Sequence, residues 1–259
     1  YQRLRRDRYR QIRMKSAYRW SPSRAISSGI LHHGHLFLGG FDAGLKITEQ
    51  GREQVIEHSE RPKDNYVNQL AVFNDNVWMA TEGGLFEVIL NGPDYYTRRV
   101  LDGAVYGLAS SDAGLAVAYG KGVLVITKDG EKKEVGFQVG IGEPRFGTVQ
   151  WHDGDLFAGG LDGLYRFAEY GAEKISGVNG YTGGWVTALL SSGSTLYIGT
   201  YEDGVYEFSG GTARQHKDLQ RQWVPPHALG LSEGQLFVGG LGMPGVLIKK
   251  SGVAELLPI

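Results

Sequence analysis

Short runs of apolar residues alternate with polar or glycine-rich turns along almost the whole chain, and this pattern recurs at a fixed interval. Six segments align: HLFLGGFDAGLKI from His35, NVWMATEGGLFEV from Asn76, GLAVAYGKGVLVI from Gly114, DLFAGGLDGLYRF from Asp155, TLYIGTYEDGVYEF from Thr195 and QLFVGGLGMPGVLI from Gln235. A small residue follows the first run of each segment, at Gly40, Thr81, Gly120, Gly160, Thr200 and Gly240, with spacings of 39 to 41 residues. Runs this short between turn residues predict strands rather than helices.

The segment around Thr200 shows how one repeat is built. Val186–Leu190 is an apolar strand, a turn rich in Ser and Gly follows, and Thr195–Gly199 is a second strand. A third strand covers Gly204–Phe208, after which two glycines turn the chain into a weaker and more polar fourth strand. Each repeat therefore predicts four strands that become more polar toward the last one.

A repeat of about 40 residues with four strands per unit is typical of a β-propeller. The sequence predicts an all-β fold, a six-bladed β-propeller of four-stranded antiparallel blades, which a short basic N-terminal arm at residues 1–24 precedes. The propeller covers residues 25–259, with blades at about 25–60, 61–101, 102–139, 140–178, 179–218 and 219–259. A solenoid is the structural alternative, but parallel β-helix repeats are shorter, and helical periodicity is present only weakly, in the arm.

Three of the repeats carry a family resemblance. Leu196–Thr200 with Gly204–Phe208 resembles the two-component regulator propeller repeat, and Val77–Thr81 with Gly84–Leu85 and Leu156–Gly160 with Gly163–Phe167 are similar to it. The resemblance covers residues 25–259 and implies a sensory or ligand-binding propeller without catalytic residues. Those repeats usually occur in larger sets within long sensor proteins, whereas six stand here after a basic arm.

The charge is distributed unevenly along the chain. Residues 1–24 carry nine basic residues and Asp7, a net charge of +8, so the remaining residues carry −9. The arm predicts contact with a membrane surface or an acidic partner, although it can also neutralise the acidic body or be solvated. The acidic body argues against nucleic acid as a partner. The first residue, Tyr1, is not Met, so a signal peptide or anchor can precede it, and we expect a bacterial periplasmic or membrane-associated location.

Cysteine is absent, which excludes disulfides, thiolate chemistry and cysteine-ligated metal clusters. Three histidines, His32, His33 and His35, resemble a metal cluster, but their register predicts a surface turn between two strands. Asp42, Glu82, Asp162, Glu202 and Asp203 lie in turns, where acidic residues before glycine are common. We therefore expect no cofactor and no metal.

The first strands of the six repeats begin at equivalent positions, 13 residues before each small residue. These positions line the mouth of the central channel and are Ser27, Asn68, Gly107, Gly147, Thr187 and His227. Because this ring contains no carboxylate, it suits an uncharged ligand better than a metal-dependent hydrolase. His227 is its ionisable member and is either a hydrogen-bonded structural residue or a general acid or base.

The loops that enter these strands carry aromatic and arginine residues. The aromatic residues are Tyr18, Trp20, Tyr66, Tyr106, Phe146, Tyr181, Trp185 and Trp223, and the arginines are Arg24, Arg61, Arg145 and Arg221. Aromatic rings with guanidinium groups form good platforms for peptides and sugars, although they can also fill gaps between blades. Trp185 and Trp223 occupy the longest loops and are the leading candidates.

Three functions agree with these observations. The first is a non-enzymatic binding module, a sensor or scaffold, that takes a protein or peptide partner or a small uncharged ligand on the aromatic and Arg loop face. The second is a channel-site lyase or hydrolase acting on a sugar or lactone, with His227 helped by Asn68 and Thr187. The third is a structural subunit of a larger membrane-associated assembly. A propeller fold alone does not decide among them.

Overall fold

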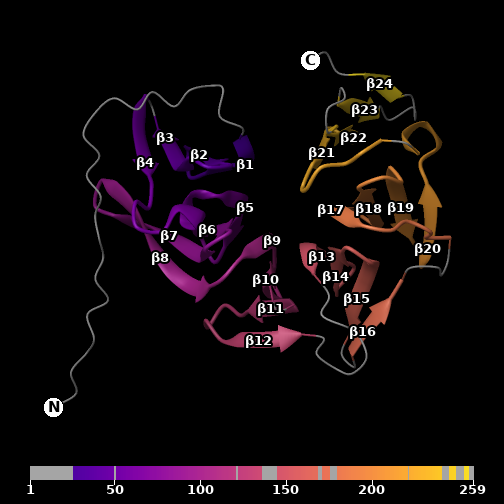
Figure 1. Ribbon diagram of the computed structural model, residues 1–259, viewed down its shortest axis with the longest axis horizontal. Helices are drawn as coiled ribbons and strands as arrows, with labels where there is room; N and C mark the ends of the chain where they lie inside the picture. The colour runs from indigo at the N-terminus through magenta and orange to yellow at the C-terminus, as the bar shows by residue number, and fades with distance from the viewer. Residues whose placement is uncertain are drawn as a thin grey trace. The chain divides into compact units, whose positions relative to one another are not determined.

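Six four-stranded antiparallel sheets make up the described part of the chain, and they are the blades of a six-bladed β-propeller. The computed structural model describes residues 26–49, 51–120, 122–135, 145–168, 171–175, 180–220, 222–240, 245–248 and 254–256. The predicted arm at residues 1–24 lies outside them. The chain divides into two compact units within strand β9, residues 1–105 and 106–259. Figure 1 shows that the strands of each sheet lie side by side in chain order.

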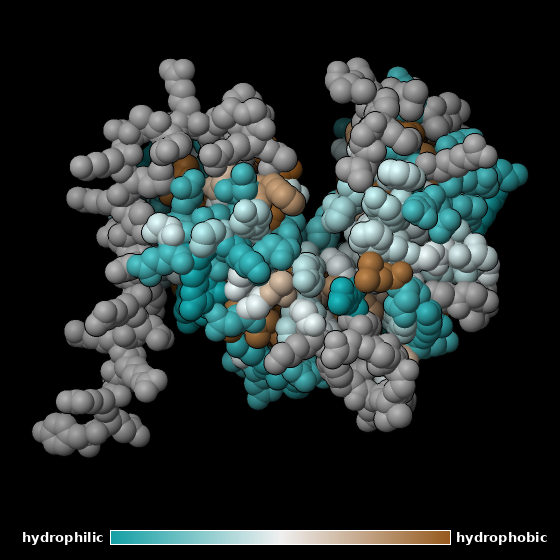
Figure 2. All heavy atoms as spheres, in the orientation of Figure 1, coloured by the Kyte–Doolittle hydropathy of each residue, from teal (hydrophilic) through white to brown (hydrophobic). Residues whose placement is uncertain are grey.

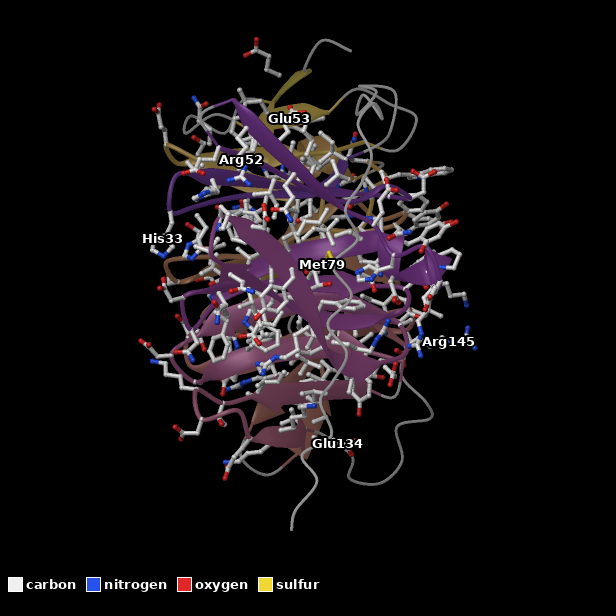
Figure 3. All side chains as sticks on the ribbon, turned by 90° about the vertical axis from the view of Figure 1, so that its left-hand side faces the viewer. His33, Arg52, Glu53, Met79, Glu134 and Arg145 are labelled. Atoms are coloured by element: carbon white, nitrogen blue, oxygen red, sulfur yellow. The ribbon has the colours of Figure 1, made fainter. Side chains whose placement is uncertain are left out.

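The first unit contains two blades. Its strands are β1 (Ile26–His32), β2 (His35–Gly40), β3 (Gly44–Glu49), β4 (Arg52–Ile56), β5 (Val67–Phe73), β6 (Asn76–Thr81), β7 (Gly84–Asn91) and β8 (Asp94–Asp102), with the 3-10 turn η1 (Pro62–Asn65) between the blades. Their core includes Phe37, Leu45, Val67, Met79 and Phe86. In Figure 3, Met79 lies among the side chains of the β5–β8 sheet, whereas His33 points outward at the edge of β1 and β2.

The second unit contains four blades. Its strands are β9 (Val105–Ser111), whose first residue belongs to the first unit, β10 (Gly114–Tyr119), β11 (Gly122–Ile126), β12 (Lys132–Val135), β13 (Phe146–His152), β14 (Asp155–Gly160), β15 (Gly163–Ala168), β16 (Gly171–Lys174), β17 (Val186–Ser192), β18 (Thr195–Thr200), β19 (Val205–Ser209), β20 (Thr212–Gln215), β21 (Leu229–Ser232), β22 (Gln235–Val238), β23 (Val246–Ile248) and β24 (Ala254–Leu256). The 3-10 turn η2 (Lys217–Leu219) follows β20.

A β-bulge opens the first strand in four of the blades. Strand β17 pairs Val186 with Thr200 and then Ala188 with Gly199, so Thr187 has no counterpart in the ladder. The same irregularity falls at Ser27, Asn68 and Gly147. A bulge turns its extra residue away from the regular pleat. Four of the predicted ring positions are therefore the bulged residues of their blades.

Adjacent blades pack through a glycine that faces a valine. A Cβ added to Gly199 in β18 would lie 2.7 Å from Cγ1 of Val224, and one added to Gly159 would lie 2.3 Å from Cγ1 of Val186. Both valines are fully buried. In these two blades the glycine of the second strand is therefore required by the close approach of the following blade, rather than by the backbone conformation alone.

Threonine fixes the turn between the second and third strands. Oγ1 of Thr200 donates to the carbonyl of Gly204 at 2.8 Å and accepts from the backbone N–H of Asp203 at 3.0 Å. Thr81 makes the corresponding contacts with Gly83 and Gly84. These bonds satisfy backbone groups in a buried turn, and they hold the residue after the strand in a defined position.

Candidate functional site

Three aromatic rings form one stack on the surface of the second unit. Tyr201 lies in the middle, with its ring centroid 4.6 Å from that of Trp185 and 5.4 Å from that of Trp223. The interplanar angles are 27° and 23°, so the three rings are close to parallel. Trp185 and Trp223 are 41% and 42% exposed. The sequence singled out both tryptophans, but it gave no role to the tyrosine that joins them.

The backbone of two neighbouring blades positions this stack. Trp185 directly precedes β17, and its carbonyl accepts a 2.9 Å hydrogen bond from the N–H of Tyr201. Trp223 directly precedes Val224, whose N–H donates to the carbonyl of Thr200 at 3.1 Å. Because Tyr201 follows Thr200 in the chain, the same strand end holds both tryptophans. The spacing of the loops in sequence does not reveal this convergence.

Further contacts hold the loop that leads to Trp185. The N–H of Gly184 donates to a carboxylate oxygen of Asp203 at 3.1 Å. The ring of Tyr181 packs edge-on against Tyr206 with centroids 4.9 Å apart, and Oγ1 of Thr182 lies 3.1 Å from the hydroxyl of Tyr206. Burial raises the pKa of Tyr181 well above its usual range, so this hydroxyl stays protonated. Hydrogen bonds and ring packing therefore hold the loop that leads to Trp185.

The outer members of the stack, Trp185 and Trp223, leave part of their apolar ring area exposed to solvent. Parallel rings that are partly exposed suit proline, aromatic or aliphatic side chains of a peptide, and the faces of sugar rings. Over β17–β20, the surface drawn in Figure 2 is mainly hydrophilic and weakly polar, with apolar residues in small patches.

A second aromatic pair lies at the equivalent place in the first unit. Tyr66 directly precedes β5 and packs edge-on against Phe41, which follows β2, with ring centroids 6.1 Å apart. The carbonyl of Tyr66 accepts from the N–H of Glu82 at 3.1 Å, as that of Trp185 does from Tyr201. Phe41 is 60% exposed. The repeat geometry thus places an exposed aromatic pair at the same blade end in each unit.

Two predicted face residues are buried, and their expected exposure was wrong. Phe146 begins β13 and packs edge-on against Tyr165 and Phe167 in the core. Tyr181 is completely covered by the β17–β20 blade. Both rings fill space within and between blades, which is the alternative that the sequence left open.

The other candidate residues differ in their surroundings. Arg145 is exposed, and Arg61 is also exposed and forms a 3.2 Å ion pair with Asp102. Tyr106 is partly exposed, and its carbonyl accepts a hydrogen bond from His227. Tyr18, Trp20, Arg24 and Arg221 lie outside the described residues.

The polar ring residues bond to backbone carbonyls of neighbouring strands. Oγ1 of Thr187 donates to the carbonyl of Val224 at 2.6 Å, and Nδ2 of Asn68 donates to the carbonyl of Val105 at 2.7 Å. Asn68 also lies 3.3 Å from a carboxylate oxygen of Glu82, an acidic neighbour that the ring pattern did not predict. These side chains therefore join successive blades.

His227 is held in a similar way. Its Nε2 lies 2.8 Å from the carbonyl oxygen of Tyr106, which can only accept, so Nε2 carries the proton. Burial lowers the pKa of His227, and the hydrogen bond to Tyr106 offsets part of this effect. A neutral imidazole that donates to the backbone has a structural role here, and this contact does not favour the channel-site enzyme.

Known structures share this fold at low sequence identity. No family model matches the chain, and no curated protein matches it in sequence. Among solved structures, it is similar to the extracellular domain of a putative hybrid two-component system from B. thetaiotaomicron, with a TM-score of 0.74 and 14% identity over 90% of this chain and 33% of that one. It is also similar to U3-55K, with a TM-score of 0.66 and 13% identity over 92% and 82% of the chains. YCF48 bound to D1 peptide matches with a TM-score of 0.59 and 13% identity over 87% and 78%.

These similarities define the class of protein. The chain is a β-propeller with the fold of the extracellular domain of a putative two-component system, and the resemblance to two-component regulator repeats is confirmed at the level of the fold. The chain spans about a third of the length of the extracellular domain that it matches. In the described part of the chain, no helix has the length and hydropathy that crossing a membrane requires.

Proposed function

We propose that this propeller is a non-enzymatic binding module that recognises a protein or peptide segment through the stack of Trp185, Tyr201 and Trp223. The observation that carries the proposal is the near-parallel stacking of three rings whose outer members are about two-fifths exposed. Trp and Tyr contribute most of the binding energy at many protein interfaces, because they present large rigid area at a small entropic cost.

Two neighbours in fold support this function. One of them, YCF48, is bound to a peptide in its structure, and another is the extracellular domain of a putative two-component system. The arrangement of His227 gives no matching support to catalysis, because its Nε2 proton is committed to a backbone carbonyl. Peptide or protein recognition on a loop surface is therefore the function we propose, with sensing or scaffolding as its purpose.

Selection of a displayed random-peptide library on the immobilised chain tests the proposal. We expect enriched peptides to bind the parent and to lose at least about 30-fold in affinity with Trp185→Ala or Trp223→Ala. Leu231→Ala is the matched control, because Leu231 is 39% exposed but lies on β21, outside the stack. Peptides that bind both tryptophan variants as well as the parent would place recognition elsewhere.

The basic arm completes the proposal. Residues 1–24, with a net charge of +8, would attach the module to a membrane surface or an acidic partner in the bacterial envelope. Co-sedimentation with anionic vesicles, with and without residues 1–24, measures this directly. Equal sedimentation of the two forms would remove the arm from the proposed function.

A further inference from the structure

Two hairpin turns of the first unit bring two imidazoles and a carboxylate together. His32 ends β1, His33 lies in the turn that follows, and Asp75 lies in the turn between β5 and β6. Nε2 of His33 is 2.7 Å from Oδ1 of Asp75, and Nε2 of His32 is 3.7 Å from the same oxygen. One ligand atom from each of the three side chains lies within 4.8 Å of the other two. The sequence predicted only the surface turn, since Asp75 is 42 residues from His33.

The distances suit a single small cation. Tetrahedral zinc has bonds of about 2.0–2.2 Å to nitrogen and oxygen, which separates neighbouring ligand atoms by roughly 3.3 Å. The two distances to Asp75 lie on either side of this value. The side chains of His33 and Asp75 are 63% and 79% exposed, so small rotations suffice to bring both onto one ion. Two imidazoles and a carboxylate are ligands that Zn²⁺ binds well.

His33 lies in a turn with a left-handed backbone. His33 and Gly34 have φ angles of +48° and +78°, the backbone of a two-residue hairpin turn. The same turn position in the other blades is occupied by Asn74, Asp112, Asp153, Gly193 and Glu233. His, like Asn and Asp, is one of the non-glycine residues that adopt this conformation most often, so the turn places the imidazole on the surface without unusual strain.

Neighbouring groups orient the cluster. Nδ1 of His35 lies 3.0 Å from the carbonyl oxygen of His33, and its Nε2 lies 3.0 Å from a carboxylate oxygen of Glu49. The rings of His32 and His33 have centroids 4.0 Å apart. Figure 3 shows His33 directed outward from the edge of the blade, where an ion can approach.

In the absence of metal, the imidazoles of His32 and His33 form hydrogen bonds directly with Asp75. Nε2 of His33 donates to the Asp75 carboxylate, and Nε2 of His32 donates to the Asp75 carbonyl at 3.0 Å. Metal binding at the two Nε2 atoms requires each neutral imidazole to carry its proton on Nδ1 instead. The cation then satisfies the carboxylate that the bond from His33 satisfied before.

We propose that His32, His33 and Asp75 form a surface site for Zn²⁺ or a similar divalent transition metal ion, with a fourth position open to water or to a side chain of a partner. A three-ligand site of this kind on an exposed turn can bridge the propeller to a second protein. The site is separate from the aromatic stack and does not depend on the function proposed for it.

Calorimetric titration of the untagged full chain with ZnCl₂ tests the site, and Co²⁺ in place of Zn²⁺ reports its geometry through visible absorption. We expect one ion per chain and the intense absorption of tetrahedral Co²⁺. His33→Ala and Asp75→Asn should each weaken binding at least about tenfold. The matched control is Glu233→Ala, which changes an exposed residue at the same turn position of another blade and should bind like the parent.

Three results would overturn the proposal: no binding of either ion by the parent, unchanged affinity in both variants, or equal weakening by Glu233→Ala. Circular dichroism of each variant checks the fold. Because Asn occurs readily at positive φ, Asp75→Asn keeps the turn of Asp75, whose φ is +64°, and decides the matter even if His33→Ala folds poorly.

Discussion

Tyr201 donates a 2.9 Å backbone hydrogen bond to the carbonyl of Trp185, and the two rings stack with centroids 4.6 Å apart. The backbone bond fixes the distance between the strand end and the loop, and the stacking then fixes the orientation of the rings. Recognition by a surface that is already ordered loses less conformational entropy on binding. The centre of the stack is therefore as important to the proposed site as its exposed members.

Removing the central ring should separate the two tryptophans and destabilise the blade. Tyr201→Ala loses two aromatic pairs, each worth about 0.5–1.5 kcal/mol, so we expect the free energy of unfolding to fall by about 1–3 kcal/mol. Tyr201→Phe keeps both ring contacts and should stay within about 0.5 kcal/mol of the parent. Urea unfolding followed by tryptophan fluorescence measures both. If Tyr201→Phe loses as much as Tyr201→Ala, the hydroxyl and not the stack carries the stability.

Adding a methyl group at Gly199 should force two blades apart. Its Cβ would lie 2.7 Å from the buried side chain of Val224, the residue next to Trp223. Overpacking of this kind costs about 1–3 kcal/mol, so Gly199→Ala should lower the urea midpoint without changing the denaturant slope. It should also weaken peptide binding, because Trp223 moves with Val224.

Gly120→Ala is the control for this substitution. A Cβ at Gly120, which follows the second strand of another blade, meets nothing within 4 Å. Its effect on the free energy of unfolding should stay near zero or be slightly stabilising. A loss at Gly120 equal to that at Gly199 would show that strain in the folded backbone, not contact between blades, governs these positions.

Much of this architecture could be predicted from the sequence. The spacing of Gly40, Thr81, Gly120, Gly160, Thr200 and Gly240 determines the number of repeats, because each marks the end of a second strand. The exposure of Trp185 and Trp223 also follows from long loops that interrupt a regular pattern. Periodicity works here because every repeat buries the same strands against its neighbours.

The contacts between repeats could not be predicted in this way. The link between Tyr201 and Trp223 and the approach of Asp75 to His33 join residues of different blades, and single-sequence patterns report only what is periodic within one blade. Burial of Phe146 was also missed, because its position just before a channel residue resembles that of an exposed loop aromatic. Its ring instead turns into the core against Phe167.

The pair of Asp64 and Arg99 should be essential to the first unit. The Asp64 side chain is 3% exposed and bonds to Arg99, which also donates to the carbonyl of Gly83 at 2.7 Å and lies 4.5 Å from the centroid of the Phe86 ring. Arg99→Ala leaves a buried carboxylate without its cation, so we expect a loss of about 3–5 kcal/mol by urea unfolding.

An exposed ion pair provides the comparison. Arg52 and Asp94 are 2.7 Å apart, with side chains 54% and 43% exposed, and Arg52→Ala should cost less than about 1 kcal/mol.

The double variant Asp64→Ala/Arg99→Ala should lose less than the two single losses added together, because no charge is then left unpaired. Simple additivity would mean that the two side chains act independently.

Acid should weaken the fold through two histidines. Burial is the main cause that lowers the pKa of both His58 and His227. At His58 the charge of Asp64 raises the pKa and that of Arg99 lowers it further. At His227 the hydrogen bond to Tyr106 raises the pKa. Between each lowered pKa and the unfolded value of about 6.5, the unfolded chain binds more protons than the folded one. Stability is therefore complete above about pH 6.5 and falls as the pH drops below it, by up to about 1.4 kcal/mol per pH unit for each group. Urea midpoints measured from pH 7.5 to 5 give this slope.

The variant His227→Asn should flatten that fall, even though it loses the bond to Tyr106. The φ of His227 is +58°, a conformation that Asn accepts, so the turn itself should survive. An unchanged slope in His227→Asn would mean that the imidazole takes up protons as easily in the folded chain as in the unfolded one, and the assignment of His227 as a neutral hydrogen-bond donor would then fail.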